Sequence, residues 1–426
     1  MPVERAILPR HLSAELKDAL TYARVVNVVG ARQVGKTTLV REILQTGRFM
    51  TLDDETVLQA MEDDPWGQLQ RLTEDTASVP LIIDEAQRSR KLALAIKRLV
   101  DASNRKGQFV LTGSSNIFST RHVADSLAGR MLTLTLWPLT AAETLSRGPS
   151  KLLDWAVSTD PDLGELPAPE PSTRTEYIDR VLKGGFPEVR ELDHRQRQRV
   201  YREYVESMVD RDVADIVRIR RTDALRRLID QLAVRTAMEL NVAELCEIVG
   251  AQRSTVEQYL DLLMRLSLVV KLGAWTSGET RREIKNAKHH FADTGIAAAL
   301  RGLTSRSFDP DADPTAFGGL LESFVLAELL RSAPYQTHGF RFYHWRDQRG
   351  REIDILAESA HRLAAMEVKA STSVSRGDFR HLRWFAGEGP GKARNVTSII
   401  FYLGEQKLQF GQRLYALPVS CLWGVA

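Results

Sequence analysis

The sequence contains few cysteines and no long apolar run. Cys246 and Cys421 are its only two cysteines in 426 residues, so the chain has neither the paired spacing of a zinc site nor the density of a disulfide framework. No segment approaches the run of about 18 apolar residues that a membrane helix needs, and the first residues lack the apolar core of a signal peptide. We therefore expect a cytoplasmic protein with reduced thiols and no membrane partner.

A strong excess of one charge is also absent. The formal net charge is +3, which permits contact with nucleic acid without indicating it. The hydrophobic fraction of 43% and the charged fraction of 27% are those of an ordinary globular protein. At this length we expect two or three domains, each with its own core.

The most informative segment follows an apolar run over residues 25–29. It has the spacing G-x-x-x-x-G-K-T of a phosphate loop and reads Gly30, Ala31, Arg32, Gln33, Val34, Gly35, Lys36, Thr37, Thr38. The two glycines allow backbone N–H groups to converge on phosphates, and the next helix adds its N-terminal dipole. Lys36 supplies a cation for the β- and γ-phosphates, and Thr37 supplies a hydroxyl for Mg²⁺. This predicts a site for a nucleoside triphosphate and Mg²⁺.

A second apolar run, over residues 81–83, ends in two carboxylates, Asp84 and Glu85. A buried parallel strand delivers acids to the carboxyl edge of its sheet in this way. We interpret the run as a Walker B strand, in which Asp84 holds Mg²⁺ with Thr37 and Glu85 orients or deprotonates the attacking water. The alternative is that both acids only cap the following helix.

A third apolar run, over residues 108–112, ends in short polar side chains, including Ser115 and Asn116. Arg130 follows at a junction between a helix and the expected strand 131–137. Here the chain resembles the AAA+ ATPases, which implies that Ser115 or Asn116 is a sensor and that Arg130 is an arginine finger donated to a neighbouring subunit. Arg121 is the rival finger, and Arg130 is equally compatible with a surface arginine after a glycine cap.

The rest of the chain divides by composition and periodicity. Strands alternate with helices over residues 1–146, which predicts a parallel α/β sheet. Residues 147–175 are rich in proline and read as a linker. We expect a helical lid over 176–222, a winged helix-turn-helix over 223–300, and a further α/β domain over 301–426.

The lid region contains Gly184, Gly185, Phe186, Pro187 and Glu188, and an Arg211-Asp212 pair follows. With these segments the chain resembles a prokaryotic AAA-type, archaeal-ATPase-like family of P-loop proteins. Members carry a C-terminal domain of unknown function with a restriction-endonuclease-like core. The resemblance implies that ATP is the nucleotide, that the protein forms homo-oligomers, and that the Arg-Asp pair is structural.

Residues 241–263 read as two helices joined at a turn, with Gly250 in the turn and Ser254 as the cap of the second helix. Such modules place the second helix in the major groove, so double-stranded DNA is a candidate partner. A basic run could form the wing: Arg281, Arg282, Lys285, Lys288. However, Glu257 and Asp261 on the second helix would repel phosphate, so an assembly role stays open.

The last domain carries acids at strand spacing. Asp354 lies in a strand over 351–356, and Glu367 and Lys369 share one face of the next strand because they are two residues apart. If these strands pair antiparallel, the two carboxylates and the amine meet, as metal-assisted phosphodiester cleavage requires. This resembles the PD-(D/E)XK nucleases, which implies that Asp354, Glu367 and the helical Glu322 are metal ligands and Lys369 is catalytic. A surface ion pair is the alternative.

Two functions follow. The first is an ATP-binding and ATP-hydrolysing machine whose winged helix and nuclease-like domain engage DNA. The second is a nucleotide-dependent assembly switch that acts on a protein partner and carries a catalytically inactive nuclease-like domain.

Overall fold

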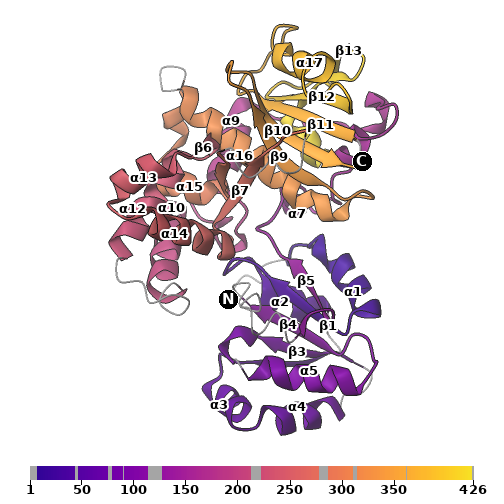
Figure 1. Ribbon diagram of the computed structural model, residues 1–426, viewed down its shortest axis with the longest axis vertical. Coiled ribbons are helices and arrows are strands. Elements are labelled where there is room, and N and C mark those ends of the chain that lie inside the picture. Colours follow the sequence, from indigo (N-terminus) through magenta and orange to yellow (C-terminus); the bar gives the residue numbers. More distant parts are fainter. Residues whose placement is uncertain are drawn as a thin grey trace. The chain divides into compact units, whose positions relative to one another are not determined.

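The computed structural model divides the chain into two compact units, residues 1–138 with 265–267 and residues 139–264 with 268–426 (Figure 1). It describes residues 7–43, 47–74, 79–89, 91–113, 127–212, 222–277, 286–309, 314–360 and 362–424. Within these ranges, no helix combines the length and the apolar character that a membrane crossing requires.

The first unit is built on a parallel sheet of five strands in the order β2-β3-β4-β1-β5. The strands are β1 (Val25–Val29), β2 (Arg48–Thr51), β3 (Leu81–Asp84), β4 (Phe109–Gly113) and β5 (Met131–Thr135). The predicted parallel α/β sheet is therefore confirmed. Since β1 lies inside the sheet between β4 and β5, the loop that follows it leaves from the middle of the carboxyl edge.

Helices complete this unit: α1 (Leu12–Tyr22), α2 (Lys36–Ile43), α3 (Glu55–Asp63), α4 (Pro65–Glu74), the short η1 (Ala86–Arg88) and α5 (Leu92–Ala102). Alternate residues of β3 and β4, including Ile83 and Leu111, are buried in one core with Ile96 of α5 and Leu69 of α4. Residues that point to the opposite face of the sheet, such as Val26 of β1, are also buried. Strands that are buried on both faces explain the continuous apolar runs of the sequence.

The second unit begins with helices of the middle region. They are α7 (Ala141–Thr144), α8 (Leu152–Ala156), η3 (Leu163–Glu165), α9 (Arg174–Lys183), η4 (Pro187–Val189), α10 (His194–Ser207), η5 (Met208–Asp212), α12 (Thr222–Val234), α13 (Val242–Val249), α14 (Arg253–Arg265) and α15 (Thr294–Leu300). Gly250 adopts a left-handed conformation and ends α13, as predicted for the turn. Ser254 is not the cap of the next helix, because α14 already begins at Arg253.

A nine-stranded sheet, in the order β13-β14-β12-β11-β10-β9-β7-β8-β6, spans the rest of this unit. Its strands are β6 (Met238–Glu239), β7 (Val269–Ala274), β8 (Lys288–Phe291), β9 (Arg341–Arg346), β10 (Glu352–Ser359), β11 (Arg362–Val368), β12 (Asn395–Tyr402), β13 (Leu408–Gly411) and β14 (Leu414–Pro418). Its remaining helices are η7 (Ser305–Phe308), α16 (Pro314–Ser332), η8 (Ala333–Tyr335), α17 (Arg380–Gly387) and η9 (Val419–Trp423).

The β7–β8 hairpin belongs to this same sheet. It lies where a wing was expected, and β7 pairs in parallel with β9 through Gly273 and Tyr343. The regions expected to be a winged helix and a separate C-terminal domain therefore share one continuous sheet (Figure 1).

The proline-rich segment 147–175 is packed within the second unit. Trp155 is 6% exposed and stacks edge-on against Tyr415 of β14. The Nζ of Lys407 donates to the carbonyl oxygens of Leu163 and Leu166 at 2.8 and 2.7 Å. The prolines in the second half of this segment predicted a linker, but its apolar residues, such as Leu153, are buried.

Candidate functional site

The phosphate-loop sequence forms a tight turn between β1 and α2. Gly30 has φ +155° and Gly35 has φ +96°, both in the region that favours glycine. A Cβ at Gly30 would lie 2.1 Å from the backbone oxygen of Leu136, so this loop also needs glycine for a close backbone approach. Helix α2 begins at Lys36, directly after the turn. The N–H groups of its first turn therefore point towards the loop.

The predicted phosphate and magnesium residues of the first unit meet at this edge. The Nζ of Lys36 donates to the carbonyl oxygens of Gly30 and Ala31 at 3.0 and 2.8 Å. The Oγ1 of Thr37 donates to Asp84 Oδ2 at 2.9 Å, and Thr112 of β4 donates to the other oxygen of this carboxylate. A hydroxyl and a buried carboxylate side by side are the hard oxygen donors that suit Mg²⁺.

Glu85 follows Asp84 in a left-handed conformation, with φ 53° and ψ 38°. Residues other than glycine rarely adopt this backbone conformation, because it is strained. Residues with such strain cluster at functional sites. Its carboxylate accepts a hydrogen bond from the amide of Gln87. Burial raises the pKa of Glu85 above its ordinary value, whereas the charge of Lys36 partly lowers it. The raised pKa means that the carboxylate of Glu85 is a stronger base than an ordinary glutamate.

Arg10 is a contact of the phosphate loop that the sequence did not predict. Its guanidinium donates to the carbonyl oxygen of Val34 at 2.7 Å and to that of Trp137 at 2.5 Å. It thus ties the loop to the chain that follows β5. The only local signal is an arginine shortly before the first helix, which spacing alone does not distinguish from a surface residue.

The proposed sensor and finger positions differ in what the structure describes. Ser115, Asn116 and Arg121 lie outside the described residues. Arg130 lies just before β5, and its Nε and Nη2 donate to the carboxylate of Asp101 at 2.5 and 3.0 Å. Because β5 runs parallel to β1, Arg130 lies at the amino edge of the sheet, opposite the phosphate loop.

The acids of the C-terminal strands come together as predicted from alternation. Strands β10 and β11 pair antiparallel with Ile355 opposite Met366, so Asp354 and Glu367 occupy the next position along. Asp354 Oδ2 accepts from the backbone N–H of Val368 at 2.9 Å. Lys369 Nζ lies 3.6 Å from Glu367 Oε2, with its side chain 37% exposed.

Lys288 occupies the centre of this acidic group. Its Nζ lies 2.9 Å from Glu322 Oε1, 2.7 Å from Glu352 Oε1 and 3.6 Å from Asp354 Oδ1. Lys288 belongs to the basic run that was expected to form a wing, but its side chain is only 3% exposed. Glu352 was not predicted, because one acid among alternating strand residues carries no signal of its own.

Glu322, Asp354 and Glu367 were expected to be metal ligands, but they are not arranged as a metal site. Across the described parts of the chain, no group of three or more His, Cys, Asp or Glu residues is placed to hold a metal ion. The physical reason is that the cation facing Glu322 and Asp354 is the ammonium of Lys288.

The pKa values of this cluster reflect burial. Burial and the charge of Asp354 raise the pKa of Glu322, and the same two causes raise that of Glu367 to about 8. Burial alone would lower the pKa of Lys288, but the three carboxylates outweigh it and raise the pKa above its ordinary value. The ammonium is therefore firmly charged.

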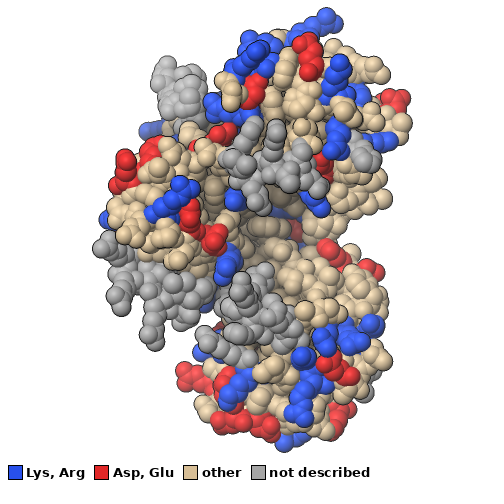
Figure 2. All heavy atoms as spheres, in the orientation of Figure 1, with Lys and Arg blue, Asp and Glu red and all other residues tan. Residues whose placement is uncertain are grey.

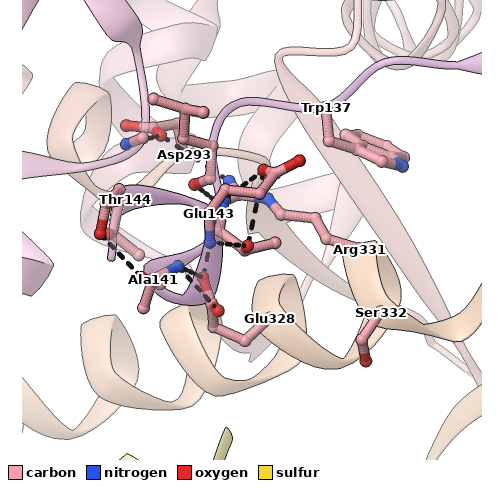
Figure 3. Close-up of polar contacts among 12 residues, drawn as sticks. Trp137, Ala141, Glu143, Thr144, Asp293, Glu328, Arg331 and Ser332 are labelled. Carbon is pink, nitrogen blue, oxygen red and sulfur yellow. Dashed lines mark hydrogen bonds and ion pairs between the residues drawn. The ribbon is translucent and has the colours of Figure 1, made fainter. Parts of the chain in front are cut away.

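A second buried charged cluster surrounds the start of α7 (Figure 3). Both carboxylate oxygens of Glu328 on α16 accept from the backbone N–H of Ala141, at 3.1 and 3.0 Å. Arg331, one turn further along, donates to the carbonyl oxygen of Ala292 at 2.6 Å and lies 3.7 Å from Asp293. Burial raises the pKa of Glu328 to about 7, against the lowering charge of Arg331. Nothing in the sequence pattern marked these residues.

Comparison with family models gives matches for three parts of the chain. Residues 22–145 match the model described as an AAA domain. Most of this AAA-domain match lies in the first unit, which carries the phosphate loop. Residues 174–307 match a domain of unknown function, DUF8612, and residues 317–422 match another, DUF4143.

Relatives and solved structures extend the comparison. An uncharacterized protein of Mycobacterium tuberculosis is 28% identical over 372 residues, which cover 86% of this chain and 75% of the relative. One from Methanocaldococcus jannaschii is 22% identical and covers 61% of this chain and 59% of the relative. A Walker-type ATPase of Pyrococcus abyssi aligns with a TM-score of 0.43 at 16% identity, over 70% of this chain and 97% of that one. The replication initiator DnaA, bound to AMPPCP and single-stranded DNA, aligns with a TM-score of 0.28 at 14% identity, over 59% and 86%.

Proposed function

We propose that the first unit binds and hydrolyses ATP with Mg²⁺. The observation that carries the proposal is the hydrogen bond of 2.9 Å between Thr37 and Asp84, which brings the hydroxyl of the phosphate loop to the carboxylate of the neighbouring motif. Mg²⁺, held by these two residues, would neutralise charge on the phosphates. Lys36 would exchange its bonds to the loop carbonyls for bonds to phosphate oxygens.

Glu85 is the proposed base of this reaction. It follows the buried Asp84 at the carboxyl edge of the sheet, and its raised pKa favours taking a proton from water. Its left-handed backbone fixes where the carboxylate lies after β3. Asn116 remains the proposed sensor, on the AAA+ resemblance alone.

The proposed homo-oligomer would place Arg130 at the site of a neighbouring subunit. Its position at the amino edge of the sheet supports a role in trans, because it cannot serve the phosphate loop of its own sheet. The ion pair with Asp101 must then be exchanged for phosphate contacts. An Arg130→Ala variant that keeps nucleotide binding but loses turnover would support this role, whereas unchanged turnover would remove it.

For the second unit, engagement of double-stranded DNA is supported by exposed arginines. Arg376, Arg380 and Arg383 are exposed, and no ion pair involves them among the described residues. Lys and Arg side chains gather around α17 at the top of the view in Figure 2. By contrast, Arg253 on α14 is paired with Glu257 at 2.8 Å. Phosphate contact would therefore fall to α17 more than to the second helix of the turn motif.

The second candidate is a nucleotide-dependent assembly switch that acts on a protein partner, with an inactive nuclease-like domain. The buried Lys288 among the acids favours it over a cleaving enzyme. Turnover of ATP with and without DNA separates the candidates, since only a DNA-engaging machine responds to nucleic acid.

A further inference from the structure

The acidic cluster of the second unit is filled by a side chain of the same chain. Lys288 on β8 meets Glu322 on α16 and two acids of β10, Glu352 and Asp354, at 2.9, 2.7 and 3.6 Å. Distances of 2.7 to 2.9 Å are those of charge-assisted hydrogen bonds between an ammonium and carboxylates. Glu322 and Glu352 lie within these distances of the ammonium, and Asp354, at 3.6 Å, adds an ion pair without a hydrogen bond.

A divalent ion does not fit this arrangement as well. Mg²⁺ binds oxygen at about 2.0–2.1 Å in near-octahedral geometry, so Glu322 and Asp354 would have to close on a common point. The ammonium already lies within 3.6 Å of an oxygen of each. A metal ion beside it would meet a like charge at a few ångströms in a buried environment, where repulsion is strong.

Other cations nearby do not take the place of Lys288. Lys369, which the nuclease resemblance singles out, pairs with Glu367 and is 37% exposed. His290, on the same strand as Lys288, is fully buried, and burial lowers its pKa well below the ordinary value, so it stays neutral. The positive charge at the centre of the cluster therefore comes from Lys288.

We propose that the ammonium of Lys288 is a tethered substitute for a divalent cation. The cluster then joins β8 to β10 and α16 as a permanent ion-pair centre, and it takes no metal while Lys288 is present. This inference concerns the second unit alone and does not depend on ATP hydrolysis by the first.

The test measures Mn²⁺ binding by electron paramagnetic resonance, in which the signal of free Mn²⁺ falls as the ion binds. The full chain is used without nucleotide and with Asp84→Asn in every sample, which removes the candidate metal ligand of the first unit. Lys288→Met keeps the length of the side chain and removes the charge. Lys271→Met, at an exposed lysine on the adjoining strand β7, is the matched control.

With Lys288 present, we expect no saturable Mn²⁺ site. Lys288→Met should create one, which the additional change Asp354→Asn abolishes, and Mn²⁺ should raise the melting temperature of Lys288→Met alone. Lys271→Met should behave like its parent. Saturable binding in the parent that Asp354→Asn removes would overturn the proposal, and this arm needs no change at Lys288. A Lys288→Met chain that neither binds Mn²⁺ nor is stabilised by it would also overturn it.

Discussion

The hydroxyl of Thr112 helps to decide how the carboxylate of Asp84 faces Thr37. Thr112 donates to one oxygen of Asp84 while Thr37 donates to the other. Removal of a group that forms a hydrogen bond to a metal ligand and so orients it typically weakens metal binding by roughly 10–100-fold. The fourth strand thus contributes to the proposed magnesium site by orienting Asp84.

Thr112→Val keeps the shape of this side chain and removes its hydrogen bond. We expect the Mg²⁺ concentration at half-maximal ATP hydrolysis to rise by roughly 10-fold or more, because the carboxylate loses its fixed orientation. Thr112→Ser keeps the hydroxyl and should remain within a factor of about 2 of wild type. Equal Mg²⁺ dependence in all three proteins would show that this bond does not orient Asp84.

The buried carboxyl of Glu328 makes the stability of the second unit depend on pH. Its pKa rises from 4.5 to about 7 on folding, so the folded state holds a proton that the unfolded chain releases between these values. This contribution is complete below about pH 4.5 and is lost as the pH rises through about 7.

Glu328→Gln should remove this part of the pH dependence. The amide can still accept from the N–H of Ala141, whereas it does not ionise. Melting temperatures measured from pH 5 to pH 8 should therefore fall less in the variant than in wild type. Glu388→Gln, at an exposed acid of the same unit, should follow wild type throughout. Parallel curves for Glu328→Gln and wild type would contradict the raised pKa.

Among secondary-structure elements, α9 depends on its terminal glycine more than α13 does. Gly184 and Gly250 end these helices with φ +68° and +70°. A Cβ at Gly184 would lie 2.1 Å from Asp293 Oδ1, and this carboxylate is buried and holds the N–H of Gly185 at 2.7 Å. A Cβ at Gly250 meets only the tip of Arg227 at 3.8 Å.

Gly184→Ala should lower the melting temperature of the second unit more than Gly250→Ala. Gly250→Ala places alanine in a left-handed conformation, which costs about 1–2 kcal/mol. Gly184 has φ 68° and ψ −166°, a conformation that is essentially restricted to glycine, so alanine is strained there as well. Only the change at Gly184 also displaces Asp293 and its hydrogen bonds. Thermal melts of both variants measure the difference, and equal losses would show that the surroundings of Gly184 can relax.

The elements that the sequence predicted are those with local signals. The strands of the first unit are continuous apolar runs, and the phosphate loop has fixed spacing, so both could be located without tertiary information. Lys288 could not be placed, since it meets Glu322 and Glu352 across long stretches of chain and resembles a wing lysine in sequence. The same applies to Glu328, whose partner Ala141 is 187 residues away.

At the scale of the whole molecule, the first unit contains most of the segment that matches an AAA domain, and the second unit contains a large mixed sheet. If that second unit binds DNA through α17, Arg380→Glu together with Arg383→Glu should weaken binding and reduce its dependence on salt, because fewer counterions are released. Arg253→Glu on α14 should change binding less. Fluorescence anisotropy over a series of salt concentrations measures the DNA affinity of both variants. An equal loss of affinity in both would show that α17 is not the preferred contact and that the net charge of the protein decides binding.

The most direct test of the central claim is ATP turnover by wild type, Lys36→Ala and Glu85→Gln, each with and without double-stranded and single-stranded DNA. We predict Mg²⁺-dependent turnover by wild type and a loss of about 100-fold or more in Glu85→Gln, which should still bind nucleotide. Lys36→Ala should lose turnover as well. A rise with DNA would favour the DNA-engaging machine, and indifference would favour the protein-directed switch. Absence of turnover in wild type, or full turnover in both variants, would contradict the ATPase assignment itself.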